Sequence, residues 1–286
     1  ILIVETGMQD ARPVKTPSPE KVEEEPGDSV PLHGEQATAV RGMIARVGYM
    51  AQDRKGLVNT HKELSSFMDA PVVGTIKRLK RVARYLKGQP REVQIFRLQG
   101  ERSNEPRIKI LDAESDTDNA QCPKTRRSTT GGDLMHGRNL LDAWSRYQKP
   151  LGLSSGENEL YGVLKAAAEA LGMGSFMKEM GFEDMMLQVW TDSSAAKGVA
   201  SRAGLGKLKH VDVRYLWIQK KVLEGALECL KKPRAEMKAD IFNKNAKAPV
   251  FKKFLNQLGF ELRPGRADSA PRLAKGAARL RVNLLL

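Results

Sequence analysis

The chain has 286 residues, of which 41% are hydrophobic, enough for one large globular domain or two small ones. It contains no apolar run of about eighteen residues or more, so no part of it should span a membrane. Its net charge of +14 is uneven, because residues 1–36 hold eight acidic and three basic side chains, a balance of −5 that leaves +19 on the rest. So basic a body favours a polyanionic partner, most simply nucleic acid, over a solvated surface that binds nothing.

Residues 1–36 are rich in Pro, Glu and Ser, a composition that buries little apolar area and predicts a disordered acidic linker. The chain starts with ILIVETGM, which lacks both an initiator Met and the positive flank of a signal peptide, so we expect a piece of a longer protein. The two cysteines, Cys122 and Cys229, have no Cys or His neighbour at metal-ligand spacing, which argues against a zinc site and a disulfide framework. A reducing, intracellular location fits this usage.

Residues 37–90 should form a small helical region, with helices at about 37–52, 56–68 and 72–88. In the last of these, Ile76, Leu79, Ala83 and Leu86 define one apolar face. Basic residues fill the remaining surface: Lys77, Arg78, Lys80, Arg81, Arg84 and Lys87. Their long side chains either cover the edge of the core or lie along a phosphate backbone, and the sequence favours neither interpretation.

Residues 91–262 should form a mixed α/β domain. Alternating polar and apolar residues predict strands at 91–99, 106–116, 128–137 and 139–148, of which at least three form an antiparallel meander. A helical apolar face at 155–179 is followed by MMLQVWTD, a nearly continuous apolar run that is typical of a strand buried on both faces. Further helices are predicted at about 193–203, 210–225, 234–245 and 249–258, with a strand at 226–231. Residues 263–286 should form a basic disordered tail.

Four carboxylates stand close to the ends of these elements: Asp116, Glu159, Asp192 and Asp240. An acid that ends a buried strand, as Asp192 does, lies at the carboxyl edge of a sheet, where α/β proteins usually place their sites. Carboxylates are ligands that Mg²⁺ prefers, and a cluster of them is repulsive unless a metal neutralises it. Each acid alone also fits a simpler role, as a helix cap, a first-turn acid, a turn former or a surface charge.

Several segments, in order, resemble the ribonuclease H domain of copia-type retrotransposon Pol polyproteins. They are SDTDNAQCPKTRRSTTGG, AWSRYQ, LSSGENELYGVLKAAAEA, VWTDSSAAKGVASRAGLGKLKHVDVRYLWIQKKVLEG and KADIFNK. Upstream, AVRGMIARVGYMAQDRKGL, ELSSFMDAP and LKRVARYLKG resemble the end of the reverse transcriptase region. The resemblance covers residues 38–260, and the order and spacing of the segments make it specific although each motif alone is weak.

The resemblance implies an α/β fold with a ribonuclease H-like mixed five-stranded sheet flanked by helices and preceded by a small helical connection region. It implies hydrolysis of the RNA strand of RNA–DNA hybrids with two Mg²⁺ ions, for which Mn²⁺ could substitute. An upstream reverse transcriptase domain of the same polyprotein would be a partner, and a cytoplasmic virus-like particle or the nucleus the location. Tyr-x-Asp-Asp, the paired-Asp motif of the polymerase, is absent from the chain, so we expect no polymerisation from it.

Carried over one at a time, the catalytic and metal-binding acids of the family fall on Asp116, Glu159, Asp192 and Asp240. Asp112 is a rival for the first position, but the register of the TRRST motif favours Asp116. Glu157 is a rival for the second, but the order Glu-Asn-Glu-Leu-Tyr favours Glu159.

Nucleic-acid contacts are expected from basic residues in the matching segments and in the basic helix: Arg126, Arg127, Lys209, Arg214, Lys77, Arg81 and Arg84. His210 could touch substrate, but a lone His beside Asp212 and Arg214 is more often structural. The motifs also depart from the family's forms, with Asn119 for Trp, Gln121 for Gly, Asn243 for Thr, and Arg-Lys-Gly-Leu for Arg-Pro-Asp-Ile at 54–57. These departures support an alternative function, a catalytically inactive, diverged fragment that only binds nucleic acid.

Overall fold

A computed structural model describes residues 1–99, 109–122, 125–206, 210–265, 267 and 269. The chain forms two compact units. Unit 1 comprises Ile1–Gln94, Asn245–Asn256 and Phe260–Leu286, and unit 2 comprises Ile95–Lys244 and Gln257–Gly259. Among the described residues, no helix is both long enough and apolar enough to cross a membrane.

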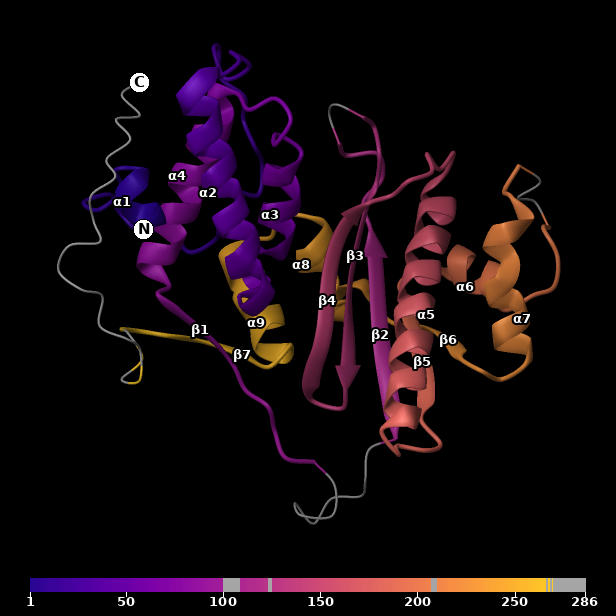
Figure 1. The fold of residues 1–286 in the computed structure, drawn as a ribbon. Coiled ribbons are helices and arrows are strands. Elements are labelled where there is room, and N and C mark those ends of the chain that lie inside the picture. Colours follow the sequence, from indigo (N-terminus) through magenta and orange to yellow (C-terminus); the bar gives the residue numbers. More distant parts are fainter. Residues whose placement is uncertain (100–108, 123–124, 207–209, 266, 268, 270–286) are drawn as a thin grey trace. The chain divides into compact units, whose positions relative to one another are not determined.

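Unit 1 contains the predicted N-terminal helical region (Figure 1). Its elements are α1 (Leu2–Glu5), α2 (Gly34–Asp53), η1 (Lys55–Leu57), α3 (Val58–Ser65), α4 (Val73–Gly88), β1 (Arg91–Gln94), α9 (Ala248–Gln257, in this unit up to Asn256) and β7 (Phe260–Arg263). The apolar stripe of α4 is buried as its 3.6-residue period predicts, with Ile76 3% and Leu79 0% exposed.

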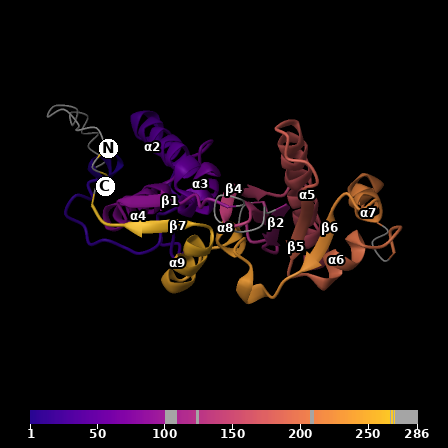
Figure 2. The same cartoon turned by 90° about the horizontal axis from the view of Figure 1, so that it is seen from below.

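The strand pairing in unit 1 differs from the prediction. The strand expected at 91–99 is shorter, and β1 forms an antiparallel ladder with β7, from Arg91↔Arg263 to Gln94↔Phe260 (Figure 2). It therefore takes no part in the meander of the larger sheet. Alternation shows that a segment can be a strand, but its partner here lies at the other end of the chain and leaves no local signal.

The N-terminal segment, predicted as a disordered linker, follows a defined path beside α4. Its backbone forms hydrogen bonds with the start of that helix, from Val73 N to the Val30 oxygen (3.0 Å) and from Gly74 N to the Asp28 oxygen (2.9 Å). The basic side chains of α4 also reach this segment. Arg84 Nε donates to the Arg12 oxygen (2.7 Å). These partners compensate a stretch that buries little apolar surface.

Unit 2 is built around the mixed five-stranded sheet that was predicted (Figure 1). Its strands, in the order β4-β3-β2-β5-β6, are β4 (Asn139–Tyr147), β3 (Thr129–His136), β2 (Ile110–Thr117), β5 (Met186–Thr191) and β6 (Glu228–Lys231). The pairs β4–β3 and β3–β2 are antiparallel, and the pairs β2–β5 and β5–β6 are parallel. The β5 strand is less buried than expected, since Met186 is exposed and only Val189 and Thr191 are fully covered.

The long helix α5 (Ser155–Glu179) has the predicted bounds and packs against β2 and β5 (Figure 1). Ser154 caps it by accepting a hydrogen bond from Glu157 N (3.2 Å). A Cβ at Gly162 would lie 2.6 Å from Ser115 Oγ, so only glycine allows the helix to approach β2 this closely. Leu160 and Val163 of α5 and Val189 of β5 are wholly buried in the core between helix and sheet.

The remaining helices of unit 2 are shorter than predicted. They are α6 (Ser194–Ala200), η3 (Val213–Leu216), α7 (Trp217–Leu223), η4 (Arg234–Glu236) and α8 (Asp240–Asn243). The helix predicted at 234–245 is thus two short turns, η4 and α8, that follow β6. Lys238, between the two turns, donates its backbone N–H to the side chain of Glu114 (2.9 Å), a contact with β2 that replaces a continuing helical bond.

Candidate metal centre

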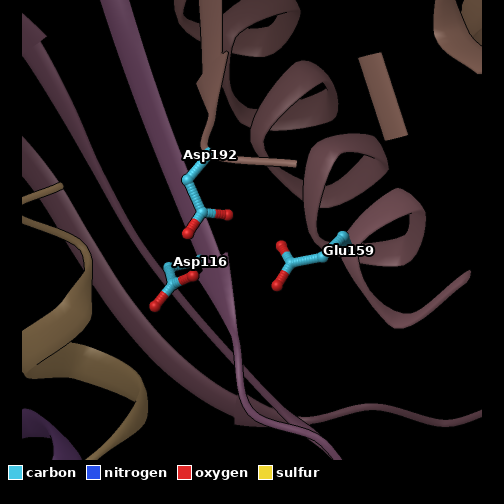
Figure 3. Close-up of side chains that lie close together, drawn as sticks. All are labelled: Asp116, Glu159 and Asp192. Carbon is cyan, nitrogen blue, oxygen red and sulfur yellow. The ribbon is translucent and has the colours of Figure 1, made fainter. Parts of the chain in front are cut away.

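Three carboxylates from separate elements of unit 2 converge at the carboxyl ends of two inner strands, β2 and β5. Asp116 lies in β2, Glu159 in α5, and Asp192 directly after β5. Each offers an oxygen, and these oxygens all lie within 4.8 Å of one another. The three side chains point toward a common space (Figure 3). This group could hold a metal ion.

The parallel pairing of β2 and β5 explains why two of these acids meet. Glu114 of β2 lies opposite Trp190 of β5, and two residues further along each chain come Asp116 and Asp192. Side chains on a strand alternate between faces, so equal steps along paired strands keep the two acids in register. Their approach is therefore a consequence of strand register, which neither motif alone reveals.

The simpler roles considered for two of these acids do not describe the structure. Ser193, and not Asp192, caps α6, because its side chain accepts a hydrogen bond from Ala196 N (3.2 Å). Glu159 stands beyond the first turn of α5, where the first-turn acid is Glu157. Asp192 is thus not a helix cap, and Glu159 is not a first-turn acid, although their positions in the sequence suggested these roles.

Burial and the negative charge of Asp116 dominate the electrostatics of Glu159 and Asp192. Burial, followed by the negative charge of Asp116, raises the pKa of Glu159 to about 8. Burial and then Asp116 also raise the pKa of Asp192. Glu159 Oε2 is buried with no hydrogen-bond partner. An unpartnered buried oxygen beside two further carboxylates is suited to a hard divalent cation, which would take these oxygens as ligands.

The fourth predicted acid, Asp240, lies beside Asp116 but outside the group of three. It is the first residue of α8, and its pKa is raised to about 6 by burial and then by a hydrogen bond with Asp116. Two neighbours in the chain also contact these acids. Asn243 Nδ2 donates to Asp116 Oδ2 (2.8 Å), and Lys244 forms ion pairs with Asp240 and, at 3.5 Å, with Asp116.

The sequence interpretation missed Lys244 and treated Asn243 only as a departure from the family's Thr. A signal existed, because Lys244 follows Asp240 by four residues, the spacing that brings side chains together on a helix. Gly131 lets the segment that holds Asn243 lie close to β3, since a Cβ at Gly131 would be 2.6 Å from Asn243 N.

A second set of charges lies further along the same face of β2. Glu114 is fully buried and accepts hydrogen bonds from Lys232 Nζ (2.5 Å), from Lys238 Nζ and from Lys238 N (2.9 Å). Lys238 Nζ also lies 3.6 Å from Asp133 Oδ1. Burial alone would raise the pKa of Glu114, but the charges of Lys238 and Lys232 outweigh it and lower the pKa. These contacts hold the segment that leads to Asp240 against the sheet.

The two rival acids have other partners. Asp112 accepts a hydrogen bond from Trp190 Nε1 (2.8 Å). Glu157 accepts hydrogen bonds from Leu153 N (2.9 Å) and from the Tyr161 hydroxyl (2.5 Å), and it lies 2.9 Å from His210 Nε2. His210 is thus held by an acid only two residues from Glu159.

The predicted nucleic-acid-binding residues fall into several environments. Arg126 and Arg127 are exposed in the connection between β2 and β3. Arg214 is exposed, with an ion pair to Asp212 at 3.1 Å. Lys209 lies outside the described residues.

The three nucleic-acid-binding residues predicted on α4, Lys77, Arg81 and Arg84, all contact the N-terminal segment of unit 1. Lys77 pairs with Glu25 (2.5 Å) and Asp28 (2.6 Å), Arg81 donates to the Thr16 hydroxyl (3.1 Å), and Arg84 binds the Arg12 oxygen. Their role in binding nucleic acid stays a prediction.

Comparison with known proteins places the chain among distant relatives of retrotransposon proteins. It is 27% identical over 264 residues to the Retrovirus-related Pol polyprotein from transposon RE1 of Arabidopsis thaliana, and 28% identical over 263 residues to that from transposon RE2 of the same plant. It is 26% identical over 250 residues to the Retrovirus-related Pol polyprotein from transposon TNT 1-94 of Nicotiana tabacum.

These alignments cover 90%, 90% and 83% of the chain but only 17%, 17% and 18% of the relatives, so the chain spans less than a fifth of their length. No family model matches the chain. The chain is therefore a distant homologue of retrotransposon Pol polyproteins, with a ribonuclease H-like mixed sheet and an acidic group at the sheet's edge.

Proposed function

We propose that unit 2 is a metal-dependent nuclease domain that hydrolyses the RNA strand of RNA–DNA hybrids. The observation that supports this most directly is the convergence of Asp116, Glu159 and Asp192, with oxygens within 4.8 Å, at the edge of a ribonuclease H-like sheet. The homology to Pol polyproteins supports a substrate that arises when an RNA is copied into DNA.

Four acids would hold the metal. Asp116, Glu159 and Asp192 would supply ligands on one side of the site, and Asp116 and Asp240, which lie beside each other, on the other side. Two bound Mg²⁺ ions, or Mn²⁺ in their place, would activate a water and stabilise the departing 3′ oxygen of the cleaved bond. Glu114 and Lys238 keep the segment before Asp240 in place, and Glu157 holds the His210 ring.

The substrate's backbone would be bound by polar and basic residues of unit 2. Arg126 and Arg127, both exposed, follow β2 in the chain, and Lys209, His210 and Arg214 precede α7 in the sequence. Contacts with phosphates supply affinity, and contacts with the 2′-hydroxyl groups distinguish the RNA strand. Lys77, Arg81 and Arg84 of unit 1 would bind nucleic acid only by exchanging their present contacts with the N-terminal segment.

We further propose that this domain acts beside a reverse transcriptase domain of the same polyprotein, in a cytoplasmic virus-like particle or the nucleus. This setting rests on the relatives' names as Pol polyproteins and on the resemblance of residues 38–88 to the end of a reverse transcriptase region.

The test is cleavage of a labelled RNA–DNA hybrid by the full chain with Mg²⁺ and with EDTA. We expect cleavage that requires the metal and falls at least about a hundredfold in Asp192→Asn, a loss of about 3 kcal/mol of transition-state stabilisation. Asp184→Asn is the matched control, because Asp184 is an exposed acid just before β5 that forms an exposed ion pair with Lys109 at 3.4 Å.

Equal, background-level product from the wild type and Asp192→Asn would overturn the nuclease function. It would favour the alternative, a fragment that binds nucleic acid without cutting it. Hybrid binding that weakens steeply with salt would then identify that binding function. The observation that favours this alternative is the ion pair of Lys244 with Asp240, because it partly neutralises the acids without a metal.

A further inference from the structure

The side chain of Lys244 lies beside two of the four acids. Its ammonium group forms ion pairs with Asp240 and with Asp116, at 3.5 Å from Asp116 Oδ2. The side chains are 26%, 16% and 3% exposed for Lys244, Asp240 and Asp116. The contact is therefore largely removed from water. A charge pair in such an environment interacts more strongly than one on an open surface.

The other two acids lack such a neighbour. Within the part of the chain that the structure describes, neither Glu159 nor Asp192 has a basic side chain at ion-pair distance. Glu159 Oε2 also has no hydrogen-bond partner. The four carboxylates thus fall into two subsites. In one, the ammonium group of Lys244 forms ion pairs. In the other, basic side chains lower the pKa of Asp192 only from beyond ion-pair distance, and the effects of burial and of Asp116 are larger.

We propose that Lys244 is a resident cation that fills the Asp116–Asp240 subsite, so that one divalent ion binds tightly at Asp116, Glu159 and Asp192 while a second must displace the ammonium group. This inference rests on the metal-dependent function proposed above and concerns how many ions the site holds. The affinity for the second ion is lowered because its binding must break the ion pair of Lys244 with Asp240. It must also move the ammonium charge away from two carboxylates.

The local fold supports a site for an ammonium group rather than an accidental surface pair. The α8 helix is a single turn from Asp240 to Asn243, and Lys244 follows it at the i+4 position from Asp240. Asn243 Nδ2 donates to the same Asp116 oxygen, Oδ2, that faces Lys244. The contacts of Glu114 with Lys238 fix the start of this turn, so both donors are aimed at Asp116 by a tethered segment.

Counting bound Mn²⁺ tests the proposal without reference to activity. Free Mn²⁺ in a titration of the full chain is measured by electron paramagnetic resonance, which yields the stoichiometry and affinities. We expect one tight ion in the wild type and a second at least about tenfold weaker. In Lys244→Met the second ion should tighten by about tenfold or more, because a unit charge close to the metal has been removed.

Two further variants show whether Lys244 acts through Asp240. In an Asp240→Asn background, Lys244→Met should no longer tighten a second Mn²⁺ ion, because the subsite for that ion has lost its own carboxylate. Lys220→Met is the matched control, since Lys220 is exposed on α7 and pairs with Glu224 at 3.7 Å. It should bind Mn²⁺ as the wild type does.

If Lys244→Met does not fold, Lys244→Arg and Lys244→Gln decide the question. Arginine retains the charge and should preserve the wild-type stoichiometry, whereas Lys244→Gln should tighten the second ion. Unchanged affinity for the second ion on loss of the charge, or weaker binding, would overturn the proposal. So would the absence of Mn²⁺ binding from every protein, which would also remove the metal-dependent function.

The two proposals can fail separately. If the second ion tightens in Lys244→Met but the wild type cleaves no hybrid, the assignment of Lys244 stands and the nuclease function falls. If the wild type cleaves hybrid but Lys244→Met binds Mn²⁺ as the wild type does, only the assignment of Lys244 falls.

Discussion

Replacing Glu159 by Gln should stabilise the metal-free protein at neutral pH and have little effect in acid. Burial and then the charge of Asp116 raise the pKa of this carboxyl group from 4.5 to about 8. A carboxyl group whose pKa is higher in the folded state stabilises the fold fully below the unfolded-state pKa. That contribution is lost as the pH rises toward and through the folded-state pKa. The relevant window here is therefore from about 4.5 to about 8.

The magnitude follows from the width of that window. Between 4.5 and about pH 7 the unfolded chain releases the proton that the folded chain retains, and each pH unit is worth about 1.4 kcal/mol, which sets an upper value of about 3 kcal/mol. Glutamine has the same shape and never ionises, so Glu159→Gln should recover about 1 to 3 kcal/mol at neutral pH, since solvent screening reduces the full effect.

The assay is urea denaturation in EDTA at about pH 4 and about pH 7, followed by tryptophan fluorescence. All three tryptophans, Trp144, Trp190 and Trp217, lie in unit 2, so the signal reports the unit that contains the site. Glu179→Gln is the control, because Glu179 is exposed at the end of the same helix. Added Mg²⁺ should stabilise the wild type more than Glu159→Gln, because a ligand stabilises the state that binds it.

Two outcomes would refute this reasoning. One is a stability difference between Glu159→Gln and the wild type that is the same at both pH values. The other is a loss of stability in Glu159→Gln at neutral pH, which would show that the ionised carboxylate is stabilised by partners in the metal-free protein.

Three further predictions concern the parts that support the site. Lys238→Met should lower the free energy of unfolding of unit 2 by about 3 kcal/mol or more, because it removes a partner of the buried Glu114 carboxylate; a loss under 1 kcal/mol by urea denaturation would contradict this. Gly131→Ala should slow hybrid cleavage more than it weakens hybrid binding, since its Cβ would lie 2.6 Å from Asn243 N and displace α8 with Asp240; equal changes in both would count against it. Trp190→Phe should cost about 1 kcal/mol, measured by thermal denaturation, through loss of the hydrogen bond to Asp112, and an unchanged Tm would rule out that role.

The elements with strong local signals were predictable from the sequence. The α5 helix has the predicted bounds because its apolar period and the Ser154 cap act within a few residues of one another. The three antiparallel strands and the mixed sheet follow from alternation and element order. The register of the motifs also selected Asp116 over Asp112, and the structure places Asp116 in the acidic group and Asp112 against Trp190.

What remained hidden depends on partners that are distant in the chain. The β1–β7 ladder pairs Arg91 with Arg263, and no sequence pattern within either strand indicates that the other is its partner. The path of the N-terminal segment depends on donors from α4, so its composition alone predicted disorder.

The sequence by itself determined which residue types could form a metal site, because hydrophobic periodicity and motif order are local properties of the chain. Only the tertiary structure decided how those acids are charged. Burial beside Asp116 raises the pKa of Glu159, while the approach of α8 places Lys244 between Asp116 and Asp240. Both effects depend on distances across the fold and on the exclusion of water. These distances and this burial cannot be read from the order of residues in the sequence.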